Sequence, residues 1–189
     1  MSLYRVLDKI LDSRNTTVGG GAASAVAGAM AAGLVGMVAR LSLGKDYGLP
    51  DERYLTLAEE LDGLVRELTQ GAQDDERAFL GIKDAFALPK GTEEEKAQRR
   101  AAVEAAAVGA ATVPLQNGHR AARVLEICAE LDGRSNPAAA SDIAAGVMLA
   151  RMAVTDCALN VDANLPLIKT PGTHQDLEDR ARALKDLGK

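Results

Sequence analysis

Apolar side chains recur every three or four residues along most of the chain, the spacing of an amphipathic helix. The pattern predicts helices over residues 3–12, 20–43, 51–88, 93–131, 137–165 and 174–187. No stretch keeps the two-residue alternation of a half-buried strand. Residues 1–189 are therefore predicted to form one all-α domain, a bundle of long antiparallel helices.

The ends of these helices carry recognisable signals. Thr92 and Glu95 have the spacing of a capping box before the helix that follows. Asn136 is suited to cap a helix that starts at Pro137. Pro114 lies inside the 93–131 segment, where it is predicted to kink the helix or break it in two.

Residues 20–43 contain an unusual helix made mostly of Ala and Gly. The chain carries no charge from Val18 to Ala39, which is long enough to cross a bilayer. Ala and Gly gain little from hydrocarbon, however, and we expect a buried helix without a membrane partner. Gly28, Ala32 and Gly36 recur every four residues and predict close packing, within the subunit or between subunits.

Three glycines, Gly19, Gly20 and Gly21, precede this helix. A dinucleotide-binding turn would need a strand before the glycines, and the preceding segment is helical in pattern. Two interpretations remain. The glycines form a tight turn between helices, or their exposed N–H groups and missing side chains receive an anion or a flat ligand.

A carboxylate interrupts the apolar stripe of the 51–88 helix. The stripe consists of Leu61, Val65, Leu68, Ala72, Asp75, Phe79, Ile82 and Phe86. Burial would raise the pKa of the Asp75 carboxyl group, which suits proton transfer near neutral pH. The alternative is a structural Asp bonded to a partner helix. The neighbouring Asp74 and Glu76 are expected on the surface.

The 137–165 helix carries several polar groups on a face of small and apolar residues. They are Asp142, Asp156, Asn160 and Asn164. Such groups are able to line a ligand cavity between helices. The alternative is hydrogen bonding between helices or plain exposure at the helix end, and we favour this alternative for Asp156.

Composition narrows the function further. The net charge of −5 and the pI near 5.1 argue against a nucleic-acid partner. Cys128 and Cys157 have neither metal-site nor disulfide-framework spacing, which fits a reduced, cytoplasmic setting. His119 and His174 stand alone, so no metal site is predicted. The methionines at 30, 37, 148 and 152 are expected to fill the core.

Taken together, the motifs resemble a known family. The segments in order are "VGGGAAS", "DDERAF", "LPKGTEEEKAQRR", "VPL", "SNPAAASD" and "ALNVDANL". Over about residues 5–168 they resemble the formimidoyltetrahydrofolate cyclodeaminase domain and the stand-alone methenyltetrahydrofolate cyclohydrolases. The family more often has Pro at positions 16 and 18, Ser or Gly at Ala22 and Gln at Glu104.

The resemblance implies a cyclodeaminase-like fold, a homodimer or larger homo-oligomer, a tetrahydrofolate derivative as substrate and no prosthetic group. It makes Asp75 the catalytic acid or base. It assigns substrate binding to Gly19, Gly20, Gly21, Lys90, Arg99, Asp142, Asn160 and Asn164. The predicted reaction is conversion of 5-formimidoyltetrahydrofolate to 5,10-methenyltetrahydrofolate and ammonia. The alternatives are a methenyltetrahydrofolate cyclohydrolase and a non-catalytic folate-binding or scaffold protein.

Overall fold

The computed structural model describes residues 3–189. These residues contain helices and no strand, which confirms the all-α prediction. The α-helices are α1 (Leu3–Leu11), α2 (Gly20–Leu41), α3 (Asp51–Ala87), α4 (Glu93–Leu131), α5 (Ala140–Asn164) and α6 (Pro171–Leu187). Two 3₁₀ turns, η1 (Pro137–Ala139) and η2 (Leu165–Leu167), flank α5.

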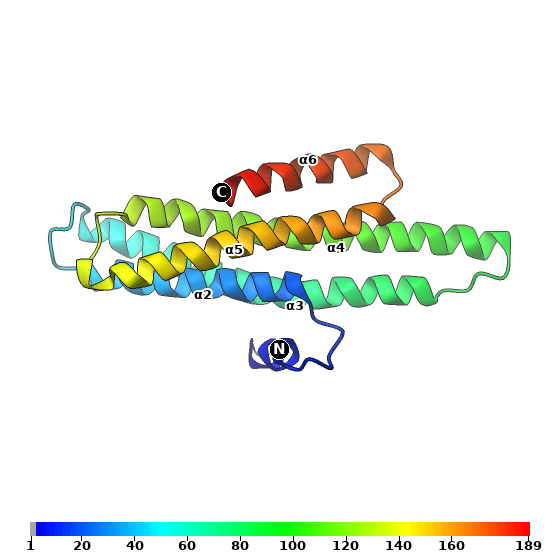
Figure 1. The fold of residues 1–189 in the computed structure, drawn as a ribbon, viewed down its shortest axis with the longest axis horizontal. Helices are drawn as coiled ribbons and strands as arrows, with labels where there is room; N and C mark the ends of the chain where they lie inside the picture. Colours follow the sequence, from blue (N-terminus) through cyan, green and yellow to red (C-terminus); the bar gives the residue numbers. More distant parts are fainter. Residues whose placement is uncertain (1–2) are drawn as a thin grey trace.

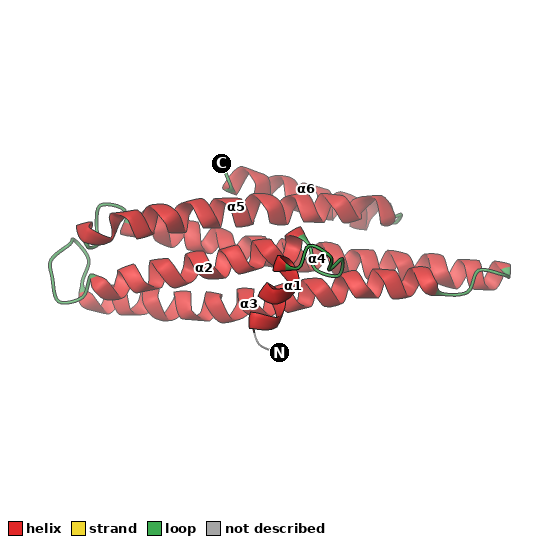
Figure 2. Ribbon diagram, turned by 60° about the horizontal axis from the view of Figure 1, so that its bottom comes forward, coloured by secondary structure: helices red, strands yellow, loops and turns green. Residues whose placement is uncertain are grey.

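Helices α2, α3, α4 and α5 form an elongated bundle (Figure 1). The ends of α3 and α4 joined by residues 88–92 project beyond the other helices (Figure 1). Helix α6 packs against α4 and α5. Helix α1 is seen nearly end-on in Figure 1 and crosses α2 and α3 (Figure 2). The loop that follows α1 leads directly to the N-terminus of α2.

The small residues of α2 allow close packing inside the bundle. A methyl group added at Gly28 would lie 3.2 Å from Leu68 of α3, and one at Gly36 would lie 3.4 Å from Leu61. Helix α2 packs on α3, α4 and α5, and its buried face is nearly all Ala, Gly and Val. The predicted close packing is thus confirmed within the subunit.

The predicted helix ends need two corrections. Helix α4 continues through Pro114 and is not broken in two there. Helix α6 starts at Pro171, three residues before the predicted start, because proline is favoured at a first helical position. The two caps are confirmed: Thr92 and Glu95 form a reciprocal capping box, and Asn136 Oδ1 accepts a hydrogen bond from Ala138 N at 3.0 Å.

The prediction that the methionines fill the core is wrong for the side chains at 30, 37, 148 and 152, which are 40–67% exposed. They lie on α2 and α5, which pack side by side. By length and composition alone, α2 and the segment Pro137–Leu167 are each apolar enough to cross a membrane. Helix α2 is mostly buried among the other helices, as expected for a core helix.

Candidate active site

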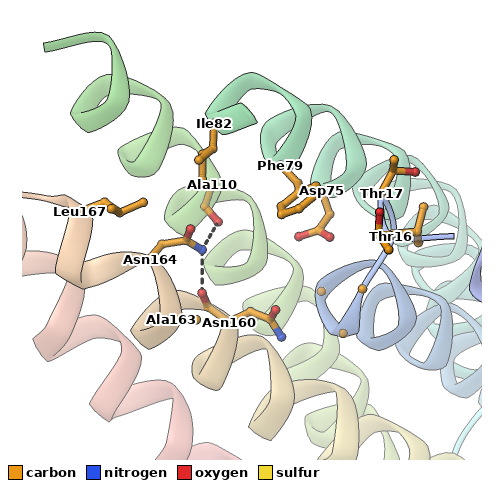
Figure 3. Close-up of a pocket in the computed structure, with 14 residues that line it drawn as sticks. Thr16, Thr17, Asp75, Phe79, Ile82, Ala110, Asn160, Ala163, Asn164 and Leu167 are labelled. Carbon is orange, nitrogen blue, oxygen red and sulfur yellow. Dashed lines mark hydrogen bonds between the residues drawn. The ribbon is translucent and has the colours of Figure 1, made fainter. Parts of the chain in front are cut away.

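A cavity of about 390 Å³ opens where the N-terminus of α2 meets α3 and the C-terminal end of α5. It brings together six of the residues assigned from the sequence: Gly19, Gly20, Gly21, Asp75, Asn160 and Asn164. Figure 3 shows the Asp75 carboxylate between the two asparagines and the Thr16–Thr17 segment. The apolar part of the cavity wall is formed by Phe79 and Ile82 of α3 and by Leu167 of η2.

Carboxylates approach two of the glycines closely, and Gly21 has no room for a side chain. A Cβ atom added at Gly21 would lie 2.2 Å from Asp75 Oδ1, closer than any real contact. One added at Gly20 would lie 3.1 Å from Asp156 Oδ2. A Cβ at Gly19 would meet nothing within 4 Å. The glycine turn therefore allows Asp75 to lie directly against the backbone of α2.

The environment of Asp75 raises the pKa of its carboxyl group from 3.8 to about 6. Removal from water is the main cause, because it disfavours the charged form. The backbone N–H of Ala22 opposes this by hydrogen bonding to the carboxylate, and the negative charge of Asp156 raises the pKa further. A carboxyl group with this pKa is suited to both accept and donate a proton near neutral pH.

The asparagines are held by backbone contacts. Asn160 Nδ2 donates to the Asp156 carbonyl at 2.8 Å and to Asp156 Oδ2 at 3.2 Å. Asn164 Nδ2 donates to Ala110 O at 3.2 Å and to Asn160 O at 2.9 Å, as drawn in Figure 3. These bonds use the amide N–H groups, so the amide oxygens are available to accept from a ligand.

Asp156 joins α5 to α2, as favoured from the sequence. Its Oδ2 atom contacts the hydroxyl group of Ser24, which also donates to Gly20 O at 2.6 Å. Sequence spacing did not single out Ser24, which is fully buried one turn into α2. A buried serine opposite an acid on another helix has no local sequence signal, because the contact joins residues 132 positions apart.

Three residues assigned from the sequence lie away from the cavity. Asp142 precedes Asn160 by 18 positions on α5, roughly 27 Å along the axis. Lys90 is exposed in the loop between α3 and α4. Arg99 of α4 stacks on Phe86 at 5.2 Å and donates from Nε to Phe86 O at 3.1 Å. Asp142 thus shares a helix face with Asn160 but does not line this cavity, and its binding role stays a prediction.

Arg99 nevertheless lines a groove next to the cavity. Phe86, Arg100, Lys169 and Leu167 also line this groove, and Leu167 lines the cavity as well. Glu104 borders the groove and accepts hydrogen bonds from the backbone N–H groups of Lys169 and Thr170 at 2.9 and 2.6 Å. A hydrogen bond with the Thr170 side chain is the main cause of the lowered pKa of Glu104, and these backbone bonds lower it further.

Two expectations for α3 are wrong. Glu76 was expected on the surface and is buried, with 7% of its area exposed, because α1 covers it. Phe79 and Phe86, predicted in the core stripe, are partly exposed, because α2 begins beside Asp75 and does not cover the part of α3 that continues beyond it. Asp74 pairs with Arg77 on the outer face of α3.

The remaining histidine, cysteine and acidic side chains are the types that metal or thiol chemistry would use. Within residues 3–189, no three His, Cys, Asp or Glu side chains cluster as metal ligands. Cys128 and Cys157 are buried free thiols, and burial raises their pKa values to about 11 and about 12. A thiol so far from ionisation is a poor nucleophile near neutral pH.

The fold and the cavity define an all-helical bundle in which a carboxyl group of raised pKa lies beside a glycine turn. The chain belongs to the formiminotransferase-cyclodeaminase family, whose sequence pattern it matches over residues 3–183. It is 36% identical over 181 residues to a methenyltetrahydrofolate cyclohydrolase of Methylorubrum extorquens, covering 94% of this chain and 83% of that protein.

Further comparisons agree. A formimidoyltransferase-cyclodeaminase of Mus musculus is 27% identical over 154 residues, which cover 81% of this chain and 28% of the mouse protein. The formiminotetrahydrofolate cyclodeaminase of Thermotoga maritima has the same fold, with a TM-score of 0.84 at 24% identity. That match covers all of this chain and 90% of the other. The cyclodeaminase-like fold is thus confirmed.

Proposed function

We propose that this chain hydrolyses a 5,10-methenyltetrahydrofolate to a 10-formyltetrahydrofolate, with Asp75 as general base and acid. The observation that carries the proposal is a carboxyl group with a pKa of about 6 against a side-chain-free turn in a cavity. The choice of reaction is supported by the cyclohydrolase of Methylorubrum extorquens, which matches this chain over most of both lengths.

The proposed chemistry needs one proton carrier. As water adds to the cationic methenyl carbon, the Asp75 carboxylate takes a proton from the water and a neutral hydroxyl adduct forms. The bond from this carbon to N5 then breaks, and Asp75 returns the proton to N5. The adduct hydroxyl group loses its proton to solvent and becomes the formyl oxygen on N10. No electrons are transferred to another group, so this scheme requires no prosthetic group.

The negative charge of Asp75 also favours the substrate electrostatically. The methenyl ring is a cation, and a carboxylate in a partly dry cavity stabilises a nearby positive charge more than it would in water. Proton transfer by such a positioned group typically contributes about 10²–10⁴-fold in rate. Ionisation of Asp75 serves binding and water activation alike, since both require the carboxylate form.

The cavity walls suggest how a flat pterin would be held. Gly19, Gly20 and Gly21 present backbone without side chains, so a ring can approach closely. On α5, the amide oxygens of Asn160 and Asn164 are suited to accept hydrogen bonds from the N–H groups of a pterin. A cavity of this size lies within the usual range for small-molecule sites.

We assign the glutamate end of the substrate to the neighbouring groove. Arg99, Arg100 and Lys169 give the groove three cations, and it meets the cavity at Leu167. Arginine binds carboxylates with two parallel hydrogen bonds. Arg99→Ala is expected to raise KM for the folate with little change in kcat, and an unchanged KM would contradict this assignment. Lys90 follows the groove residue Phe86 by four positions in the sequence, and it adds positive charge at the projecting end of the bundle.

Cyclodeamination is the second candidate. The structural match to the cyclodeaminase of Thermotoga maritima and the similarity to the mouse protein favour it. In that reaction, N10 attacks the N5-formimino carbon and ammonia leaves after taking a proton. The same carboxyl group would supply that proton, so the site geometry serves both reactions.

Two absorbance assays separate the candidates. A cyclohydrolase makes the absorbance of 5,10-methenyltetrahydrofolate decay faster than in buffer alone, and a cyclodeaminase makes it accumulate from 5-formimidoyltetrahydrofolate. Decay without accumulation supports the proposal. Accumulation supports the second candidate, and no change in either assay supports the non-catalytic alternative.

We also propose that the protein forms a homodimer or a larger homo-oligomer. Met30 and Met37 on α2 and Met148 and Met152 on α5 expose apolar surface that a monomer rarely leaves to water. Light scattering after gel filtration measures the mass directly. Met152→Glu is expected to shift the mass towards the monomer, and a monomeric parent protein would contradict the proposal.

A further inference from the structure

Glu76 follows Asp75 on α3 and contacts α1. Its side chain is buried, and Lys9 Nζ of α1 donates a hydrogen bond to its Oε1 atom. The Thr17 hydroxyl group lies 3.3 Å from the same oxygen and 2.8 Å from Asn15 Oδ1, with one proton to donate. One turn of α3 therefore carries both the proposed base and an ion pair to the N-terminal segment.

Residues 3–19, which we term the N-terminal strap, comprise α1 and the loop that leads to α2. Figure 2 shows α1 lying across α2 and α3. The loop supplies Thr16, Thr17, Val18 and Gly19 to the cavity wall. Part of the active site thus belongs to a segment that is not in the four-helix bundle.

The strap has few points of attachment. Helix α1 is nine residues long, and helices of this length are marginal without tertiary contacts. Val6 is fully buried in a small cluster with Ala22, Ala25, Val26 and Ala72. The ion pair between Lys9 and Glu76 is a polar attachment of this helix to α3. A buried carboxylate needs this partner, because an unpaired buried charge is costly.

We propose that Glu76 is a positioning residue that fastens the N-terminal strap over the catalytic cavity through Lys9. With the ion pair formed, residues 16–19 complete the cavity wall. With the strap lifted, both charges return to water and that wall is lost, while Asp75 stays in place on α3. The fastening therefore controls substrate affinity and not the proton-transfer step. The expected effect on catalysis rests on the proposed function.

The test uses Glu76→Gln and Lys9→Met, which break the pair from either side. Arg5→Met removes an exposed cation of the same helix and serves as the matched control. We expect both test variants to raise KM for 5,10-methenyltetrahydrofolate about tenfold, with kcat near the parental value. A tenfold rise follows if the fraction of molecules with the strap fastened falls to about a tenth, because only these molecules bind substrate well. The control is expected to match the parent in both parameters.

Hydrogen exchange followed by mass spectrometry gives a readout that needs no substrate. In both test variants, we expect faster exchange over residues 3–19 and unchanged exchange over α3 and α4. The charge-swapped variant Lys9→Glu with Glu76→Lys is expected to recover slow exchange and the parental KM. Recovery would show that the pairing matters, and not the burial of Glu76 alone.

Unchanged exchange over residues 3–19 in both test variants would overturn the proposal. So would faster exchange with a parental KM, or a fall in kcat at constant KM. If the parent protein acts on neither folate, the proposed function fails, and the exchange data still decide whether Glu76 fastens the strap.

Discussion

Replacing Asp75 by Asn separates the chemical role of this residue from its effect on stability. Asn has nearly the same shape, so it fits beside Gly21, but it does not exchange a proton at neutral pH. We expect kcat to fall by about 10²–10⁴-fold, the usual contribution of a positioned acid or base. The same substitution is expected to stabilise the folded protein at neutral pH.

The gain in stability follows from the raised pKa of Asp75. The folded state binds the proton more tightly than the unfolded state, whose pKa is near 3.8, so stability falls as the pH rises from 3.8 through about 6. One pKa unit corresponds to about 1.4 kcal/mol, and the full difference corresponds to at most about 3 kcal/mol. Above pH 6 the parent bears this cost, whereas the Asn variant does not.

Paired measurements at two pH values test both effects. For a chain of this size, 1 kcal/mol shifts Tm by about 2–4 °C. The Asn variant is therefore expected to melt several degrees above the parent at pH 8, and the difference is expected to vanish below pH 4. A variant that keeps parental turnover would refute the catalytic role, and one that melts no higher than the parent at pH 8 would refute the assigned cause of the pKa.

Three further predictions concern pH and the glycines. The rate of methenyl hydrolysis, corrected for buffer, is expected to rise with pH through about 6 as Asp75 ionises, and a falling profile would contradict its role as base. Gly21→Ala places a methyl group 2.2 Å from Asp75 Oδ1 and is expected to lower kcat at least about tenfold. Gly109→Ala on α4 meets nothing within 4 Å, and we expect it to retain activity and gain about 0.5–1 kcal/mol of stability. Equal activities of these two variants would disprove the steric argument. Gly71→Ala places a methyl group 2.0 Å from Asn117 Oδ1 between α3 and α4, and we expect it to lower the free energy of unfolding by about 1–3 kcal/mol in a denaturant titration.

The helices could be predicted because their signals are local. Capping residues and apolar periodicity depend on neighbours within one or two turns, and the helix ends agree to within about three residues. Pro114 is the instructive exception. A proline removes one backbone hydrogen bond, but packing on the buried face of a 39-residue helix keeps the helix continuous.

The site could be predicted only in part, because the sequence shows the face of a helix but not how far its neighbours extend. Asp75 interrupts an apolar stripe, and this signal was sufficient to find it. The burial of Glu76 depends on α1, whose position no spacing within α3 reveals. Asp142 shares a face with Asn160, yet the cavity reaches only the C-terminal end of α5.

The glycine turn and the acidic pair are parts of one arrangement. Asp75 reaches its partly dry position only because residue 21 has no side chain, and Asp156 approaches residue 20 for a similar reason. The two carboxylates thus flank the first turn of α2, where backbone N–H groups point outwards. The Ala22 N–H limits the cost of the Asp75 charge, while burial and Asp156 keep the pKa of Asp75 well above that of an ordinary aspartate. A larger residue at position 21 would push the carboxylate towards water, so Gly21, which lines the cavity, also influences the proton affinity of the group inside it.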